Sequence, residues 1–278
     1  MTAATSLRFL NSLSFSDLAS VGGKAAALGE ITQAGCRVPP GFVVPCEYRE
    51  RALRGDLDQQ AFESEVVERC EELGSMPLAV RSSGVSEDSG DASWAGQFTT
   101  YLNVKRADVV ARIRDCWQSP GSAHASAYAA RHNALDRRWD LAVIVQAMVA
   151  SEVSGVLFTV DPVSRNPNEC SIEAVVGLGE PLVQGEVTPQ SYVLDRVTGE
   201  VLKEHEGQQQ VALRLTGNGM ERVALPTGGE VLLTRTMLSE LLETGLRLEK
   251  HFGRPQDIEW VYEGDVLSVV QSRPITTL

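Results

Sequence analysis

A mixed fold of the α/β or α+β class, arranged as two lobes, is predicted by three observations. Apolar, β-branched runs of strand length alternate with longer segments of helical periodicity. Turns rich in Gly and Pro separate these segments, and no internal repeat is present. The 278 residues are enough for two lobes. We place the N-terminal lobe at residues 1–145 and the C-terminal lobe at residues 146–278.

Helices and strands alternate in the N-terminal lobe. Ser16 and Asp17 offer an N-cap to a helix that reaches Ala34, and Gly35 suits its C-terminal end. Apolar spacing predicts further helical segments over 46–75 and 107–133. Apolar runs predict strands at 42–44, 78–83, 98–104 and 141–149.

Strands dominate the C-terminal lobe. We expect strands at 154–160 and 172–176, short strands within 191–233, and a closing hairpin over 258–275. One helix is expected at 236–251. A second Gly-rich loop follows the strand at 172–176.

Charge and composition exclude several classes of protein. The chain has 37 acidic against 25 basic residues and a net charge of −12, so a broad nucleic-acid-binding surface is not expected. No run of eighteen apolar residues indicates a membrane span, and no secretory signal is visible. The five cysteines are odd in number and never spaced as CxxC, which favours a reducing cytoplasm.

The first candidate site is Gly22-Gly23-Lys24, at a helix start. Two glycines let a ligand approach the backbone, and the lysine supplies a compact positive charge. This is not a Walker A loop, because Leu18 and Ala25 stand where that motif needs Gly and Ser or Thr. An exposed helix lysine is the alternative reading.

The second candidate is Arg81, at the end of an apolar strand and before a loop rich in Gly, Ser and Asp. Backbone N–H groups of such a loop can surround phosphate oxygens. A surface hairpin is the alternative, in which Glu87, Asp88 or Asp91 pairs with the arginine.

The third candidate is the C-terminal hairpin. Gln271 and Arg273 share a face of its second strand, because successive side chains alternate. Glu259 joins them only if the hairpin loop has an odd number of residues: a three-residue loop, Tyr262-Glu263-Gly264, would bring it to that face, and a two-residue loop would turn it away. A carboxylate, an amide oxygen and a guanidinium on one face suit Mg²⁺ and nucleotide phosphates. A solvated polar face is the alternative.

Gln146 interrupts an apolar strand and must be hydrogen-bonded if it is buried. Its partner could be a nucleobase or a backbone carbonyl, and the sequence favours neither.

Taken together, these segments resemble the ATP-binding domain of the phosphoenolpyruvate synthase, pyruvate phosphate dikinase and rifampicin phosphotransferase family. The resemblance is carried by five stretches in the family's order, which span nearly the whole chain. They are residues 21–44, 79–104, 143–164, 175–189 and 257–275.

The resemblance implies an ATP-grasp-like fold with ATP in a cleft between two lobes. Lys24 and Arg81 correspond to phosphate-binding cations, and Arg273 to the arginine on the transferring phosphate. Glu259 and Gln271 match the metal-binding pair for Mg²⁺. The remaining positions that the resemblance implies lie over the nucleotide or beside its adenine, and they are Gly96, Thr100 and Gln146.

Two departures from the family stand out in the sequence. Gln190 occupies a position where we expect the family to favour aspartate. In the family, phosphate passes from ATP to a histidine on a separate swivelling domain, and the Gly-Gly and Ser/Thr/Cys-His segment of that domain is not found here. The only echo is Ser122-Ala123-His124, in a helical region, and we interpret His124 as structural.

We therefore expect the ATP-binding subunit of a split dikinase-type enzyme. It would phosphorylate a histidine on a separately encoded partner, which passes the phosphate to a small-molecule acceptor, and it would release AMP. A self-contained ATP-grasp kinase or ligase that releases ADP is the alternative. A non-catalytic nucleotide sensor is a third reading, against which the complete set of cations and metal-ligand candidates argues.

Overall fold

The computed structural model describes residues 6–85, 99–119, 140–217, 219–226, 233–276 and 278. Residues 1–30 and 39–148 form one compact unit, and residues 31–38 and 149–278 form a second. Each unit combines helices with antiparallel sheet, which confirms the predicted mixed class. Within the described ranges, no helix is both long and apolar enough to cross a bilayer.

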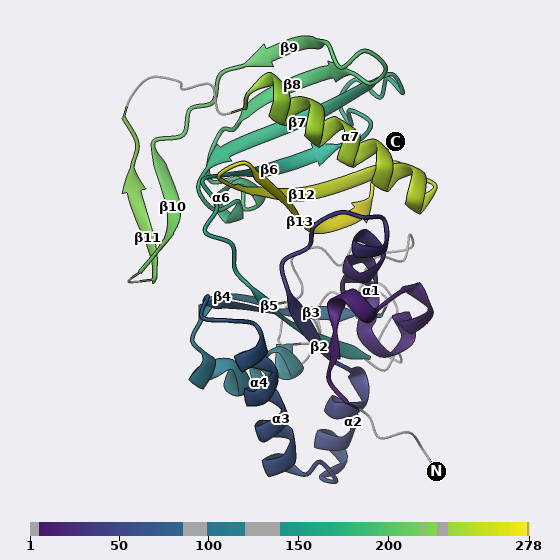
Figure 1. The fold of residues 1–278 in the computed structure, drawn as a ribbon, viewed down its shortest axis with the longest axis vertical. Coiled ribbons are helices and arrows are strands. Elements are labelled where there is room, and N and C mark those ends of the chain that lie inside the picture. Colours follow the sequence, from purple (N-terminus) through teal and green to yellow (C-terminus); the bar gives the residue numbers. More distant parts are fainter. Residues whose placement is uncertain (1–5, 86–98, 120–139, 218, 227–232, 277) are drawn as a thin grey trace, which may run out of the picture. The chain divides into compact units, whose positions relative to one another are not determined.

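The first unit is built on a five-stranded antiparallel sheet (Figure 1). All seven residues of its central strand β5 are buried, as expected for a strand with neighbours on both sides. The spatial order is β1 (Arg8–Phe9), β2 (Gly41–Val44), β5 (Leu141–Ala147), β3 (Leu78–Gly84) and β4 (Thr100–Val104).

Three helices pack against one face of this sheet. They are α2 (Cys46–Arg54), α3 (Gln59–Glu72) and α4 (Val109–Gln118). Phe62 of α3 and Ile113 of α4 join Val80 and Val145 of the strands in one buried cluster. Burial of these side chains removes apolar surface from water and stabilises the unit.

The prediction of one helical segment over 46–75 is wrong, because the segment forms two helices, α2 and α3. Gly55, with φ of 75°, ends α2 in the left-handed conformation that glycine adopts without strain. Asp58 then caps α3, because its carboxylate accepts a hydrogen bond from the Ala61 N–H at 3.0 Å. Gly55 and Asp58, three residues apart, therefore divide one apolar pattern into two helices.

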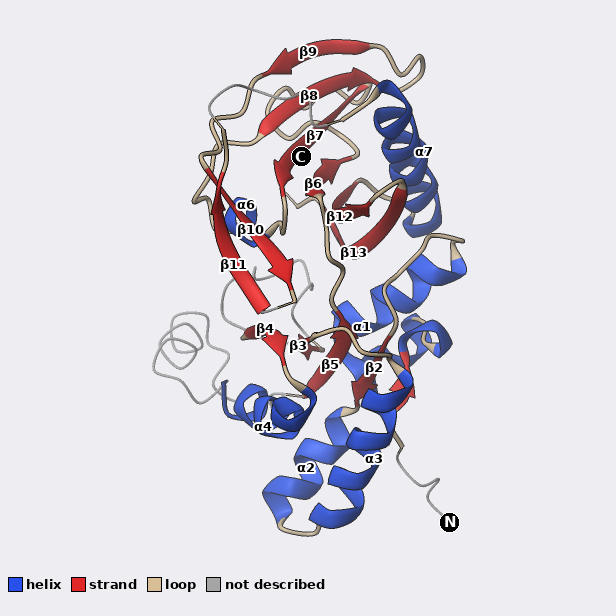
Figure 2. Ribbon diagram, turned by 60° about the vertical axis from the view of Figure 1, so that its left-hand side comes forward, coloured by secondary structure: helices blue, strands red, loops and turns tan. Residues whose placement is uncertain are grey.

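The second unit is built on a six-stranded antiparallel sheet. Helix α7 (Arg235–Phe252) packs against β6 and β12, and Figure 2 shows it beside these strands. Gly245 lets the helix approach closely, since a Cβ there would lie 2.6 Å from Leu157. The spatial order is β13 (Val266–Pro274), β12 (Gln256–Glu263), β6 (Val153–Phe158), β7 (Glu169–Val176), β8 (Gln190–Asp195) and β9 (Val201–His205).

A two-stranded ribbon, β10 (Val211–Thr216) and β11 (Gly219–Ala224), stands beside this sheet (Figure 1). The Leu178 N–H donates to the Leu213 carbonyl at 2.7 Å, which ties the ribbon to the segment before the short helix α6 (Glu180–Val183). An ion pair between Arg222 and Glu186 at 2.8 Å adds a second tie.

The boundary of the packed units lies after Met148, three residues beyond the predicted lobe boundary at 145/146. Residue 146 belongs to β5, whose hydrogen bonds to β2 and β3 hold it in the first sheet. Residues 31–38 pack with the second unit, where the Arg37 carbonyl accepts from the Val269 N–H at 2.8 Å. The functional division into lobes at residue 145 stays a prediction.

Candidate functional site

Gly22 bends helix α1 (Leu18–Gln33) just before Lys24. Its φ of 76° and ψ of 168° are not helical, so the helix is kinked there. A Cβ at this position would lie 2.2 Å from the Ser83 carbonyl oxygen, so only glycine fits. The Ala25 N–H also donates to Ser83 Oγ at 3.2 Å. Both contacts fix the backbone on either side of Lys24 against strand β3.

The helix start itself differs from the expectation. Ser14, and not Ser16 or Asp17, provides the N-cap, in a capping box with Asp17 that begins the short 3-10 helix Phe15–Asp17. Arg8 donates to Asp17 Oδ1 at 2.6 Å, and this hydrogen bond lowers the pKa of the Asp17 carboxyl.

Arg81 and Thr100 lie directly opposite each other on β3 and β4. Side chains alternate along β3, so Arg81 and Ser83 share one face, and Ser83 is the residue that contacts the Lys24 segment. The opposite face of β3 carries Val80, which packs in the core with helices α2–α4. The structure therefore brings Arg81, Thr100 and the Lys24 segment to the side of the first sheet that faces away from those helices.

Gln146 lies on the same side of the first sheet. It pairs with Ala79 of β3, and only 3% of its surface is exposed. Its Nε2 donates to the Pro39 carbonyl at 3.0 Å, so the structure shows the backbone partner that the sequence left open. A contact between Gln146 and adenine stays a prediction. The amide oxygen would make that contact, since Nε2 donates to Pro39.

In the C-terminal hairpin, Glu259 and Gln271 share a face because of a two-residue turn combined with a β-bulge. Glu263 pairs with Val266, so the turn has two residues, Gly264 and Asp265, and the three-residue alternative is not formed. A two-residue turn alone would point Glu259 away from Gln271.

A β-bulge restores the pairing. Trp260 pairs with Val269, but the preceding Glu259 pairs with Gln271, so Val270 is an extra residue in β13. Glu259 and Gln271 consequently lie directly opposite each other on one face of the sheet. Residues opposite each other in adjacent strands have Cβ atoms roughly 5 Å apart, close enough for two oxygen donors to share one ligand.

Asp257 is a functional candidate that the sequence reasoning missed. It lies opposite Arg273, and its Oδ2 accepts from Arg273 Nε at 2.8 Å. Burial raises the pKa of the Asp257 carboxyl, and the Arg273 charge opposes that rise. The ion pair orients the guanidinium, which is 44% exposed. The i, i+2 spacing from Glu259 could have revealed Asp257, since it places both carboxylates on one face.

Glu173 on β7 is a second missed residue. Val156 of β6 pairs with both Glu259 and Glu173, so the two carboxylates belong to one row across the sheet. Burial raises the pKa of Glu173, and repulsion from Asp257 and Asp161 adds to the rise. The indication in the sequence is that Glu173 is the one acidic residue within the apolar run 172–176.

The donor set in the second unit fits Mg²⁺. Glu259 offers a carboxylate and Gln271 an amide oxygen, and Mg²⁺ in nucleotide sites takes few protein oxygens and completes its shell with phosphate and water. In the described part of the chain, no group of three or more His, Cys, Asp or Glu residues could hold a metal ion by itself. An ion held at Glu259 and Gln271 would complete its coordination shell with phosphate oxygens and water.

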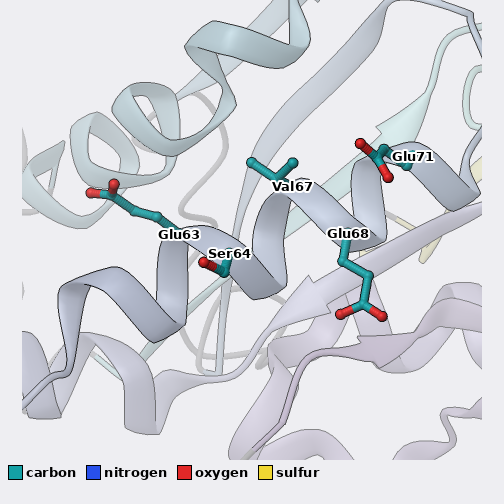
Figure 3. Close-up of a pocket in the computed structure, with 5 residues that line it drawn as sticks. All are labelled: Glu63, Ser64, Val67, Glu68 and Glu71. Carbon is teal, nitrogen blue, oxygen red and sulfur yellow. The ribbon is translucent and has the colours of Figure 1, made fainter.

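Some predicted features lie outside the described residues. They are Gly96, the acidic residues Glu87, Asp88 and Asp91 of its loop, and His124. A shallow depression on α3, lined by Glu63, Ser64, Val67, Glu68 and Glu71, contains none of the predicted site residues (Figure 3). Helix α3 covers the core side of the first sheet, away from Arg81 and Gln146.

The departure at Gln190 has a structural explanation. Gln190 pairs with Ala174, on the sheet side that carries Trp260 and packs toward α7, opposite the side of Glu259 and Gln271. Its Nε2 donates to Glu204 Oε1 at 3.1 Å. An ionised aspartate has no donor for this bond and would repel Glu204.

The family described as "Pyruvate phosphate dikinase, AMP/ATP-binding domain" matches residues 53–278. The chain belongs to this family. The match includes seven of the eight site residues that the resemblance implies, and only Lys24 lies before it.

Curated relatives match more of the chain. A probable phosphoenolpyruvate synthase of Archaeoglobus fulgidus is 38% identical over 94% of this chain and 40% of its own length. The phosphoenolpyruvate synthase of Pyrococcus furiosus is 34% identical, over 98% of this chain and 44% of its own. A rifampicin phosphotransferase of a Streptomyces species is 37% identical, over 94% and 35%. The chain thus spans less than half the length of these relatives.

Solved structures give more distant likenesses. An ADP complex of N5-carboxyaminoimidazole ribonucleotide synthetase has a TM-score of 0.43 at 11% identity, covering 92% of this chain and 46% of that one. A dinucleotide-forming acetyl-coenzyme A synthetase of Ca. Korarchaeum cryptofilum has a TM-score of 0.43 at 12% identity, covering 91% of each chain.

The contact between Gly22 and Ser83 can be tested with Gly22→Ala. We expect the free energy of unfolding to fall by more than in Gly55→Ala, because both positions have a positive φ but a Cβ clashes at position 22 and meets nothing within 4 Å at position 55. The left-handed conformation alone costs about 1–2 kcal/mol. Urea denaturation measures both variants, and equal losses would contradict the close approach.

The metal assignment can be tested with Glu259→Gln, which keeps the side-chain shape and removes the charge. We expect the magnesium-dependent affinity for ATP to fall about 10-fold or more, equivalent to about 1.4 kcal/mol. Glu263→Gln is the matched control, since Glu263 is on the same strand but exposed beside the turn. Titration calorimetry with and without Mg²⁺ measures the ATP affinity of both variants. An unchanged affinity in Glu259→Gln would rule out Glu259 as a metal ligand.

Proposed function

We propose that this chain is the nucleotide-binding part of a dikinase-type phosphotransferase that takes phosphate from Mg-ATP. The observation that carries the proposal is the placement of Glu259 directly opposite Gln271, with Arg273 held by Asp257 on the same face. Membership of the AMP/ATP-binding domain family supports ATP as the ligand.

The proposed roles follow from charge and donor chemistry. Lys24, Arg81 and Arg273 bind phosphate oxygens, and Glu259 and Gln271 hold Mg²⁺. When bound, the metal neutralises charge that develops on the phosphates. Catalysis is then a matter of positioning and charge neutralisation.

Three further residues are proposed as nucleotide contacts. Thr100, opposite Arg81, and Gly96, in the loop before it, cover the phosphates, and Gln146 lies on the adenine side. Burial of Gln146 and its bond to Pro39 make it a fixed point of the first sheet.

The phosphate acceptor is proposed to be a histidine on another domain or a separate protein. ATP then loses two phosphoryl groups: one forms a P–N bond to the imidazole, the other passes to water as inorganic phosphate, and AMP is released. The histidine passes its phosphoryl group to a small molecule. The relatives are more than twice as long as the part this chain matches, which supports a role for further domains.

Cytoplasmic location is also a proposal. The five cysteines are buried and free, which supports a reducing compartment.

The experiment incubates the chain with Mg-[β-³²P]ATP and the part of the Archaeoglobus fulgidus relative that lies outside the match. We expect acid-labile, base-stable label on that part and AMP as the nucleotide product. Label on a histidine cannot arise if ATP only donates its γ-phosphate. ADP as product would instead support a self-contained kinase or ligase.

A matched pair of variants tests the role of Lys24 in this assay. Lys24→Ala should slow transfer by about 10²–10³-fold, since loss of one preorganised donor costs about 2.7–4 kcal/mol. Lys105→Ala, beside the end of β4, should leave the rate unchanged. Equal rates for both variants would contradict a role for Lys24.

A further inference from the structure

A buried polar cluster lies directly behind Asp257 and Arg273 in the second sheet. Gln256 precedes Asp257 on β12, and Ser272 precedes Arg273 on β13. Successive side chains of a strand alternate between faces, so Gln256 and Ser272 belong to the opposite side of the sheet from the ion pair. Only 2% of Gln256 and 5% of Ser272 are exposed. An amide and a hydroxyl buried in this way must find partners within the protein.

Both ends of the Gln256 amide are hydrogen-bonded. Ser272 Oγ donates to Gln256 Oε1 at 2.8 Å. Gln256 Nε2 donates to the Arg254 carbonyl at 2.9 Å and to the Pro255 carbonyl at 3.2 Å. Two carbonyl partners require the donor end of the amide, so the oxygen end is the one that meets Ser272. The hydrogen bond between Gln256 and Ser272 therefore has a defined donor and acceptor.

Thr159 joins this pair to the neighbouring strand and to helix α7. Its N–H donates to the Gln256 carbonyl and its Oγ1 accepts from the Gln256 N–H, each at 2.9 Å. Thr159 is 1% exposed, and its Cγ2 would lie 3.3 Å from a Cβ at Gly245 of α7. We call Thr159, Gln256 and Ser272 the buried clamp. Its side chains satisfy one another, and a satisfied buried network holds its members in one geometry.

The backbone ladder beside Arg273 is interrupted on both sides, so side-chain bonds matter there. Residues 271–274 of the edge strand β13 follow the bulge at Val270, which disrupts the pairing with β12. Beyond them, the Ile275 N–H donates to the Pro255 carbonyl at 3.1 Å, but Pro255 has no N–H to return a bond. The bond from Ser272 to Gln256 lies within this short stretch and holds it to β12 from the buried face.

We propose that Gln256 and Ser272 are positioning residues for Arg273, and that the hydrogen bond between them fixes the direction in which the guanidinium meets a phosphate. This inference rests on the proposed function, in which Arg273 binds the transferring phosphoryl group. Asp257 restrains the guanidinium through Arg273 Nε at 2.8 Å. The Arg273 side chain is 44% exposed, so water competes for that bond, and a fixed backbone keeps its two partners aligned.

Ser272→Ala tests the clamp with the smallest change, because it removes one hydroxyl. Ser272→Thr is the conservative variant, since it returns a hydroxyl at the same position. Ser268→Ala is the matched control: it is the same substitution at a position of β13 that is 3% exposed, but on the other side of the bulge from Arg273. Melting temperature is measured for every variant, which separates a loss of stability from a loss of position.

The first readout is the Arg273 side chain itself, and it needs neither nucleotide nor partner. The NMR signal of the Arg273 Nε–H group, assigned with Arg273→Lys, reports the hydrogen bond to Asp257. We expect this proton to exchange with water about 10-fold faster or more in Ser272→Ala, as loss of one bond from a buried network predicts. Ser268→Ala and Ser272→Thr should keep the original exchange rate. An unchanged rate in Ser272→Ala overturns the positioning role.

The second readout is a double-mutant cycle in the label-transfer assay described above. Ser272→Ala should lower kcat about 10-fold or more and keep the calorimetric affinity for Mg-ATP within about 2-fold, because a misplaced group acts on the transfer step. In the background of Arg273→Lys, which keeps a charge, Ser272→Ala should cause no further loss, since the guanidinium that it positions is gone.

The two readouts distinguish failure of the positioning role from failure of the proposed function. Equal losses of kcat from Ser272→Ala in both backgrounds indicate a structural role alone and overturn the proposal. No transfer by the unmodified chain overturns the proposed function, and the exchange of the Arg273 proton then decides by itself whether the clamp holds the guanidinium.

Discussion

Val270 is the residue on which the shared face of Glu259 and Gln271 depends. Strand side chains alternate with a period of two, so a slip of one residue exchanges the faces of a strand. The two-residue turn at Gly264 sets one register, and the extra residue at Val270 changes it before Gln271. Glu259 and Gln271 share a face only because both features are present. Without the bulge, the carboxylate and the amide oxygen could not act on one ligand.

In both sheets, the face that packs against helices and the face that carries the candidate residues are opposite faces. Each buries one face against helices, α2–α4 in the first unit and α7 in the second, and this burial stabilises the unit. The candidate residues lie on the other face in each case, where polar side chains need no apolar partners. Arg81 and Gln146 illustrate this in the first sheet, and Glu259 and Gln271 in the second.

The sequence predicted strands better than their connections, for physical reasons. A buried strand has a run of apolar residues in the sequence, and such runs predict β5 and β7. The helix end at Gly55 is not predicted, because the apolar pattern continues through the break. The β-bulge at Val270 is not predicted either, because no residue type requires a bulge. The sequence left the shared face of Glu259 and Gln271 dependent on loop length, and a two-residue turn with a bulge gives the same parity as a three-residue loop. Asp257 was missed although its spacing from Glu259 was visible.

The central claim is that side chains from distant parts of the sequence act on one triphosphate. A crystal structure with Mg²⁺ and a non-hydrolysable ATP analogue tests it most directly. The account predicts a metal about 2.1 Å from oxygens of Glu259, Gln271 and the phosphates, with Lys24 Nζ and the Arg273 guanidinium on phosphate oxygens. A triphosphate bound with neither Glu259 nor Gln271 in the metal's coordination shell would contradict it.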